Sequence, residues 1–216
     1  MKFISLVIFF IFITANAFAQ YSLRAGMGIS FVSSSSLTDY INENFASYNQ
    51  QLGTFNSAIN FSGEFDYSTS QSYQVGLDLA YLLNSYTYSS IGGIYKMNYD
   101  ILMPTLVNYY VISGEGYIFK FGGGIGPRFV NVNEQLPGTP SGTNYTSTGF
   151  GLLIRVDANT LLSKNLYANI GGDLKYDING KPSSNGKYLV NNNANYSDVN
   201  FNMFSAVLRI GLTYTF

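Results

Sequence analysis

The 216-residue chain contains neither cysteine nor histidine, and these two absences remove much of the familiar chemistry of enzymes. Without cysteine there are no disulfide bonds, no thiolate nucleophiles and no soft metal ligands. Without histidine the chain lacks the side chain that most often acts as a general base near neutral pH, and also a common zinc ligand. We therefore expect no catalytic residue, no metal site and no cofactor.

Charge is scarce as well. Charged residues make up 11% of the chain, whereas aromatic residues make up 17%, with 19 Tyr and 17 Phe. The 11 basic residues are balanced by 12 acidic ones, so no basic face is available for nucleic acid. Few charges and many aromatics suit a chain in which apolar and polar residues alternate, as they do in a membrane β-barrel.

The N-terminal stretch "MKFISLVIFFIFITANAFAQ" has the features of a cleaved secretory signal. Basic Lys2 precedes an apolar run over 3–13, and the small-x-small triplet 17–19 ends at a predicted cleavage site between Ala19 and Gln20. The apolar run is shorter than the roughly 20 residues of a membrane-spanning helix. An uncleaved signal anchor is the alternative. We expect a signal peptide over 1–19 and one domain over 20–216.

The chain ends in "RIGLTYTF", where apolar and polar residues alternate. Successive side chains of a β-strand point to opposite faces, so this period of two predicts a strand with one apolar face. The residues that share the apolar face are Leu208, Ile210, Leu212, Tyr214 and Phe216.

Seven further segments show the same alternation, near 21–31, 59–67, 73–83, 95–111, 117–129, 149–160 and 166–178. Short polar turns at 68–72, 113–116 and 162–165 alternate with longer connections at 32–58, 84–94, 131–148 and 179–200. A soluble β-sandwich shares the strand pattern, but alternating short and long connections are typical of outer-membrane barrels. The sequence predicts an all-β fold: an eight-stranded antiparallel transmembrane β-barrel with short periplasmic turns, long extracellular loops and both termini periplasmic.

The charges fall on the face opposite to the apolar one. We predict that the following residues point into the barrel: Arg24, Lys96, Lys120, Arg128, Arg155, Lys175, Arg209, Glu64, Asp66, Asp78, Asp100, Asp157, Asp173 and Asp177. In the fourth segment this assignment turns Tyr99, Ile101, Met103, Val107 and Tyr109 outward, and Pro104 predicts a bulge. Side chains fill the interior of an eight-stranded barrel, and buried charges must be paired. We therefore predict a salt-bridged lumen and no wide aqueous pore.

The export signal, the eight alternating strands, the Gly-rich "FKFGGGIGPRF" and the terminal "GLTYTF" together resemble the small outer-membrane β-barrel proteins. These are the OmpX/OmpW-like and OmpA-transmembrane group. The resemblance implies a place in the outer membrane of a Gram-negative bacterium, in contact with its lipid. It also implies that the apolar residues of the terminal strand are a signal read by the outer-membrane assembly machinery. The enzymes among these barrels use a histidine, which this chain lacks.

Two functions follow from these observations. The first is non-enzymatic: a part in outer-membrane structure, or interaction with a surface partner through the extracellular loops. The second, implied by the resemblance to OmpW-like barrels, is a narrow channel or transporter for small hydrophobic molecules, with an apolar cavity near Leu102, Pro104 and Leu106. A soluble periplasmic lipid-binding barrel would instead turn its apolar face inward. A paired-carboxylate mechanism at Asp173 and Asp177 is formally open.

The first long connection carries the sequence "SLTDYINENFASYNQQL", in which apolar residues recur at helical spacing. Ser36 and Asp39 have the spacing of a capping box. A short amphipathic helix over the barrel mouth is expected, acting as a lid, as a contact surface, or simply ordering the loop.

Overall fold

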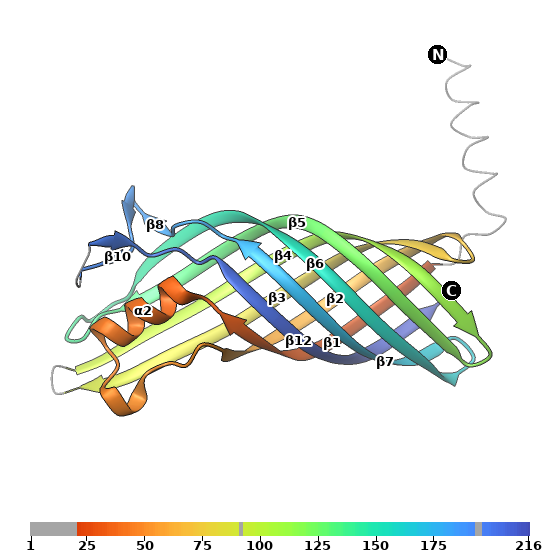
Figure 1. The fold of residues 1–216 in the computed structure, drawn as a ribbon, viewed down its shortest axis with the longest axis horizontal. Coiled ribbons are helices and arrows are strands. Elements are labelled where there is room, and N and C mark those ends of the chain that lie inside the picture. Colours follow the sequence, from red (N-terminus) through yellow and green to blue (C-terminus); the bar gives the residue numbers. More distant parts are fainter. Residues whose placement is uncertain (1–20, 91–92, 193–195) are drawn as a thin grey trace, which may run out of the picture.

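The structure is a computed structural model that describes residues 21–90, 93–192 and 196–216 (Figure 1). The predicted signal peptide 1–19 and its cleavage site between Ala19 and Gln20 lie outside the described residues. Within the described part of the chain, no helix has the length and apolarity needed to cross a membrane.

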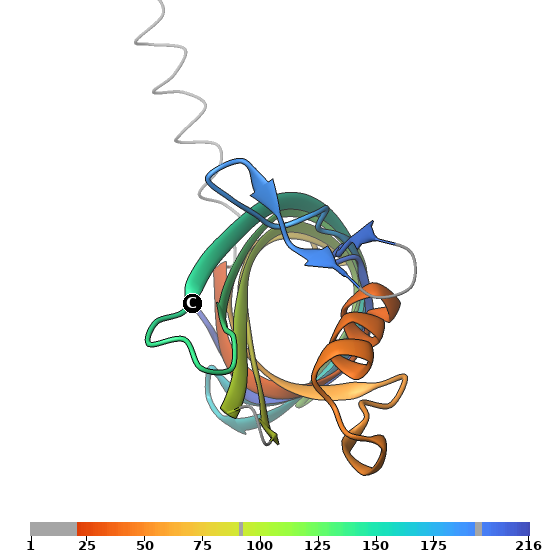
Figure 2. The same ribbon diagram turned by 90° about the vertical axis from the view of Figure 1, so that its left-hand side faces the viewer.

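Eight long antiparallel strands form a closed barrel, which Figure 2 shows end on. They are β1 (Tyr21–Ser33), β2 (Asn56–Ser70), β3 (Tyr73–Ser90), β4 (Gly93–Gly114), β5 (Tyr117–Gln135), β6 (Thr143–Ser163), β7 (Leu166–Ile178) and β12 (Met203–Thr215). Neighbours in the ring follow the order β5-β4-β3-β2-β1-β12-β7-β6, and pairing of β5 with β6 closes it. The predicted all-β, eight-stranded antiparallel barrel is confirmed.

The two ends of the barrel differ. At the turn end, two residues connect β2 to β3, β4 to β5 and β6 to β7, and both described termini lie there (Figure 1). The opposite, loop end carries α2 (Ser35–Asn44), the short helix η2 (Tyr48–Gln50) and the two-residue strands β8 (Ser183–Ser184), β9 (Lys187–Tyr188), β10 (Val190–Asn191) and β11 (Ser197–Asp198). Much of the expected loops at 84–94 and 131–148 is strand, because β3, β4, β5 and β6 continue beyond their predicted ends.

Large apolar side chains cover the outside of the barrel. Leu208 is 67% exposed and Ile170 is 66% exposed, and the outward residues of every long strand continue this surface. So extensive an apolar surface is incompatible with water and matches the lipid-facing band of a transmembrane barrel. Toward the loop end the outward residues become polar, for example after Leu83 on β3 and after Phe129 on β5. The strands therefore extend past the membrane at this end.

The predicted side-chain directions are wrong along the whole of β4, where Met103, Val107 and Tyr109 are also buried inside the barrel. Tyr99 and Ile101 point into the barrel, at 2% and 0% exposure, whereas Lys96 is exposed and Asp100 is partly exposed. Asp100 accepts a hydrogen bond from Asn131 Nδ2 at 3.0 Å on the outside of the sheet. This part of β4 lies beyond the membrane, where polar residues face water and apolar residues fill the interior, so the pattern is the reverse of that within the lipid. Asp100 and Lys96 are not lumen charges.

The bulge predicted at Pro104 is also absent. Leu102 pairs with Phe129 and Leu106 with Ile125 in one unbroken register, and only the intervening pairs are missing. Proline has no N–H to donate to the ladder, so the gap follows directly. The Arg128 side chain turns toward this gap and donates from Nη1 to the carbonyl oxygens of Pro127 at 3.0 Å and Gly126 at 3.2 Å.

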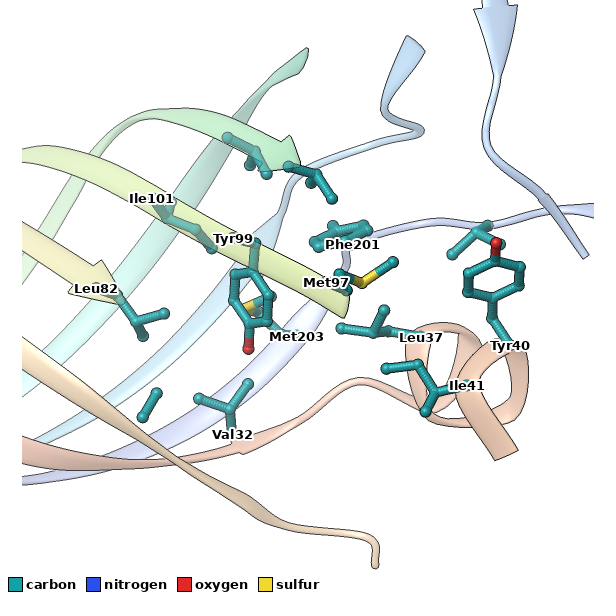
Figure 3. Close-up of a cluster of buried hydrophobic side chains, with 14 of the residues drawn as sticks. Val32, Leu37, Tyr40, Ile41, Leu82, Met97, Tyr99, Ile101, Phe201 and Met203 are labelled. Carbon is teal, nitrogen blue, oxygen red and sulfur yellow. The ribbon is translucent and has the colours of Figure 1, made fainter. Parts of the chain in front are cut away.

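The loop-end half of the interior is an apolar core closed by α2 (Figure 3). Leu37 and Ile41 of α2 point toward Met97, Tyr99 and Phe201 in the barrel mouth, and all of these side chains are buried. The helix therefore forms at the predicted place and packs into the mouth. The predicted capping box does not form, because the N-cap is Ser34 and Ser36 lies inside the helix.

Candidate functional site

A continuous ion-pair network fills the middle of the barrel. Three buried arginines stand at its centre: Arg24 on β1, Arg155 on β6 and Arg209 on β12. Arg24 contacts Glu64 at 2.8 Å, Asp157 at 2.7 Å and Asp78 at 3.2 Å. The network thus joins opposite walls of the barrel, from β2 and β3 across to β6.

Arg155 and Arg209 complete this network. Arg155 contacts Glu64 at 2.5 Å, Asp173 at 2.8 Å and Asp78 at 3.2 Å. Arg209 contacts Asp157 at 2.5 Å and Asp173 at 2.7 Å. With Lys175, which lies 3.6 Å from Asp173, four basic groups face four carboxylates, so the network is neutral. Pairing of this kind is what allows ionised groups to persist in a water-poor interior.

Two separate ion pairs extend the charged region along the barrel. Lys120 contacts Asp66 at 2.6 Å toward the turn end, and Arg128 contacts Asp177 at 2.5 Å toward the loop end. Apart from Lys96, thirteen residues were predicted to form the lumen charge network. Twelve of them are buried inside the barrel, and Asp100 is not. The twelve are Arg24, Glu64, Asp66, Asp78, Lys120, Arg128, Arg155, Asp157, Asp173, Lys175, Asp177 and Arg209.

Tyr109 belongs to the same network, although sequence reasoning placed it outside. Its hydroxyl donates to Glu64 Oε2 at 2.7 Å and accepts from Arg155 Nη1 at 3.2 Å. Glycine makes room for the long side chains: a Cβ at Gly171 would lie 2.6 Å from Arg209 Nη2. Within the described ranges, no group of three or more acidic residues is arranged to hold a metal ion.

A second buried polar cluster fastens α2 to the barrel. The hydroxyls of Tyr40 on α2 and Tyr95 on β4 both donate to Glu134 Oε1 on β5, at 2.5 Å and 2.9 Å. The Phe45 ring stacks on Tyr95 with centroids 3.6 Å apart. Glu134 lies beyond the lipid-facing band, and burial raises the pKa of its carboxyl above the ordinary value. Sequence reasoning missed Glu134 because its segment was assigned to a loop.

Several aromatic side chains are exposed to solvent on the outer surface of the loop end. Tyr48 is 89% exposed, Tyr196 is 77% exposed, and Phe55 and Tyr188 are each more than half exposed. Their charged neighbours are few. Lys181 pairs with Asp198 at 2.8 Å and lies over the Tyr188 ring. This surface is aromatic and polar, with no concentration of positive charge.

No protein-family model matches the chain, and no curated protein matches it. Solved structures do. Neisserial surface protein A (NspA) aligns with a TM-score of 0.54 at 14% identity, covering 91% of this chain and 97% of that one. The chain has the fold of the small outer-membrane β-barrel proteins. Ail of Yersinia pestis, in complex with the heparin analogue sucrose octasulfate, aligns with a TM-score of 0.54 at 12% identity, covering 92% and 99% of the two chains. A major outer membrane protein of Thermus thermophilus aligns with a TM-score of 0.50 at 17% identity, covering 92% and 100%.

Proposed function

We propose that this small outer-membrane β-barrel is non-enzymatic, lies in the bacterial outer membrane with both termini in the periplasm, and acts through its loop end in membrane structure or surface interaction. The observation that carries the proposal is the contrast between a filled interior and an elaborated loop end. Ion pairs occupy the middle of the barrel, and an apolar core with α2 occupies the mouth. The surface that extends beyond the lipid is what remains for contact with a partner.

Outer-membrane lipid and the assembly machinery are the partners that the barrel itself implies. Leu208, Ile210, Leu212, Tyr214 and Phe216 form an outward row, each at least 44% exposed. Phe216 still belongs to the seam of the barrel, because its backbone N–H donates to the Tyr21 carbonyl at 2.9 Å. We infer that this row is both lipid-facing surface and assembly signal. Domain limits of 1–19 for the signal and 20–216 for the barrel are part of the same proposal.

We do not propose that this chain binds a sulfated ligand of the kind present in the Ail complex. A polyanion needs several unpaired basic residues close together. The exposed loop-end lysines are Lys96, Lys181 and Lys187, and Lys181 is already paired with Asp198. The exposed tyrosines and amides favour a protein surface or an uncharged glycan instead, because tyrosine combines an apolar ring with a hydroxyl.

The channel or transporter function has two surface clefts in its favour. The larger, of about 640 Å³ near the loop end, lies between β2 and β3 and is lined by none of the expected residues Leu102, Pro104 and Leu106. The smaller, of about 340 Å³, is lined by Leu106 together with Gly124 and Ile125, so one of the three expected residues does mark a cleft. Transport would also need a path past the Arg155 and Arg209 ion pairs at mid-barrel. We therefore propose surface interaction and not transport.

Two measurements test the proposal. Purified barrel in planar bilayers should show no large, stable, ohmic conductance. Cells that display a variant with Tyr48, Phe55, Tyr188 and Tyr196 all changed to Ser should adhere less to a protein-coated surface than cells displaying equal amounts of the wild type. A variant with Leu152, Leu174 and Ile210 changed to Ala, on the lipid-facing wall, is the matched control. Equal adhesion of the Ser variant and the wild type would refute a loop-end interaction, and a large conductance would refute the filled interior.

A further inference from the structure

Strands β2 and β3 separate at the loop end of the barrel. Their pairing runs without a break from Asp66 to Ile59, which pairs with Leu83, and stops there. Beyond this point β2 stays paired with β1 as far as Asn56, whereas β3 stays paired with β4 as far as Ser90, which pairs with Gly93. The wall therefore opens as a wedge between the two strands, where the lipid-facing band meets the polar extension.

The wedge forms the cleft of about 640 Å³, within the range usual for small-molecule sites. Its membrane side is apolar: Ile29, Ile59 and Leu83 line it and are 54%, 51% and 38% exposed. These three side chains belong to the lipid-facing surface, so the cleft is continuous with the hydrocarbon of the surrounding leaflet.

The opposite side of the cleft is polar and holds no basic residue. Ser57, Ser85, Asn98 and Asp100 line it. Ser85 Oγ donates to Asn98 Oδ1 at 2.6 Å, and the Asp100 carboxylate contributes a negative charge. The apolar side of the cleft therefore faces the position of an amphiphile's tail in the membrane, and the polar side faces the position of its head group.

The floor of the cleft is closed toward the barrel interior. Ala58 and Tyr99 form part of it and are 4% and 2% exposed. The Tyr99 hydroxyl accepts a hydrogen bond from Asn84 Nδ2 at 3.1 Å, which ties β3 to β4 behind the cleft. A molecule in the cleft remains in contact with the leaflet and does not continue into the lumen.

We propose that the cleft between β2 and β3 is a lateral binding site for an amphiphile of the surrounding leaflet. One apolar chain lies against Ile29, Ile59 and Leu83. A neutral or cationic head group lies beside Asp100, because a carboxylate with no basic neighbour in the cleft attracts a cation and repels a phosphate. This site goes beyond the loop-end interaction and does not depend on it.

The experiment exploits the absence of tryptophan from the chain. A Ser57→Trp variant places a single fluorescent reporter at the cleft, and a Phe150→Trp variant places one on the lipid-facing surface of β6 near the same end. Each is reconstituted in phosphatidylcholine vesicles and titrated with a bromine-labelled dodecyl chain carrying a trimethylammonium, maltoside or phosphate head. Bromine quenches tryptophan only at close range, so a bound chain and bulk lipid give different titration curves.

Quenching at Ser57→Trp should saturate at a low amphiphile fraction, with the trimethylammonium head tighter than the phosphate head by several-fold. Quenching at Phe150→Trp should rise in proportion to the amphiphile. Adding Asp100→Asn to Ser57→Trp should keep the saturation and remove the preference for the cationic head. Adding Ala58→Leu, which fills the floor, should remove the saturable part.

The proposal is overturned if the two reporters respond alike, or if the phosphate head binds best. The comparison of Ser57→Trp with Phe150→Trp decides the question even if Ala58→Leu fails to fold, which a gel shift between heated and unheated samples would reveal.

Discussion

Removing Arg155 should destabilise the barrel more than any other single charge substitution in the lumen. Its guanidinium contacts Glu64, Asp78 and Asp173, at 2.5, 3.2 and 2.8 Å, and it is 1% exposed. An Arg155→Met change keeps much of the volume but leaves four carboxylates facing three basic groups. Breaking a buried ion pair by removing one partner costs about 3–5 kcal/mol, a large part of the ~5–15 kcal/mol that stabilises a typical folded protein.

A second change should restore part of this loss. Asp78 has only two partners in the network, Arg24 and Arg155. Adding Asp78→Asn to Arg155→Met makes the network neutral again, so the double variant should recover about 1–3 kcal/mol relative to Arg155→Met alone. This result would separate the cost of an unbalanced charge from the loss of packing.

The assay is reversible urea unfolding in lipid vesicles, followed by tyrosine fluorescence and by the gel shift between folded and unfolded barrel. Exposed Lys96, changed to Met, is the matched control and should alter the free energy of unfolding by less than about 0.5 kcal/mol. A cost of less than about 1 kcal/mol for Arg155→Met, or a further loss on adding Asp78→Asn, would refute a charge-balanced network.

Three further outcomes follow from the structure. Gly28→Ala should impair closure of the barrel, because a Cβ there would meet the Leu208 carbonyl oxygen across the β1–β12 seam. Gly63→Ala is the control and should assemble normally, because its Cβ would make only an ordinary contact at 3.9 Å. The gel shift between heated and unheated samples measures folding of both variants. Deleting Phe216 should reduce the amount of folded barrel in the membrane fraction, and an unchanged amount would contradict its role as an assembly signal. Docking of α2 should strengthen as the pH falls from neutral through the raised pKa of Glu134, because the docked state holds the carboxyl proton more tightly than the undocked state. The effect should level off below pH 4.5, the ordinary pKa of a glutamate carboxyl. Hydrogen exchange of α2 amides measures this, and Glu134→Gln should remove the pH dependence.

The side-chain directions of a strand can be predicted from the sequence where its outward face contacts lipid along its whole length. In β7 and β12 the outward residues face lipid along most of the strand, so alternation alone assigns Asp173 and Arg209 to the interior. In β4 the inward side chains are apolar through most of the strand, for example Met103 and Val107, so both of its faces are apolar within the lipid. The outward face becomes polar beyond the lipid, where Lys96 and Asp100 lie, and these two charges then support the opposite assignment.

Two parts of the candidate site were beyond prediction for a different reason. Glu134 receives hydrogen bonds from Tyr40 and Tyr95, which come from a loop helix and another strand. Such a cluster is set by tertiary packing and leaves no local pattern in any one segment. The cleft between β2 and β3 arises where pairing stops at Ile59 and Leu83, and strand alternation continues unchanged through that point.

The central claim is that the loop end faces the outside of the cell. Because the chain has no cysteine, a single introduced thiol can be labelled without background. Tyr48 lies on the loop end and its side chain is 89% exposed, whereas Glu115 lies in a turn at the other end. Each is changed to Cys in a separate variant. On intact cells, a membrane-impermeant maleimide should label Tyr48→Cys and leave Glu115→Cys unlabelled until the outer membrane is opened. Labelling of Glu115→Cys alone on intact cells would contradict the account.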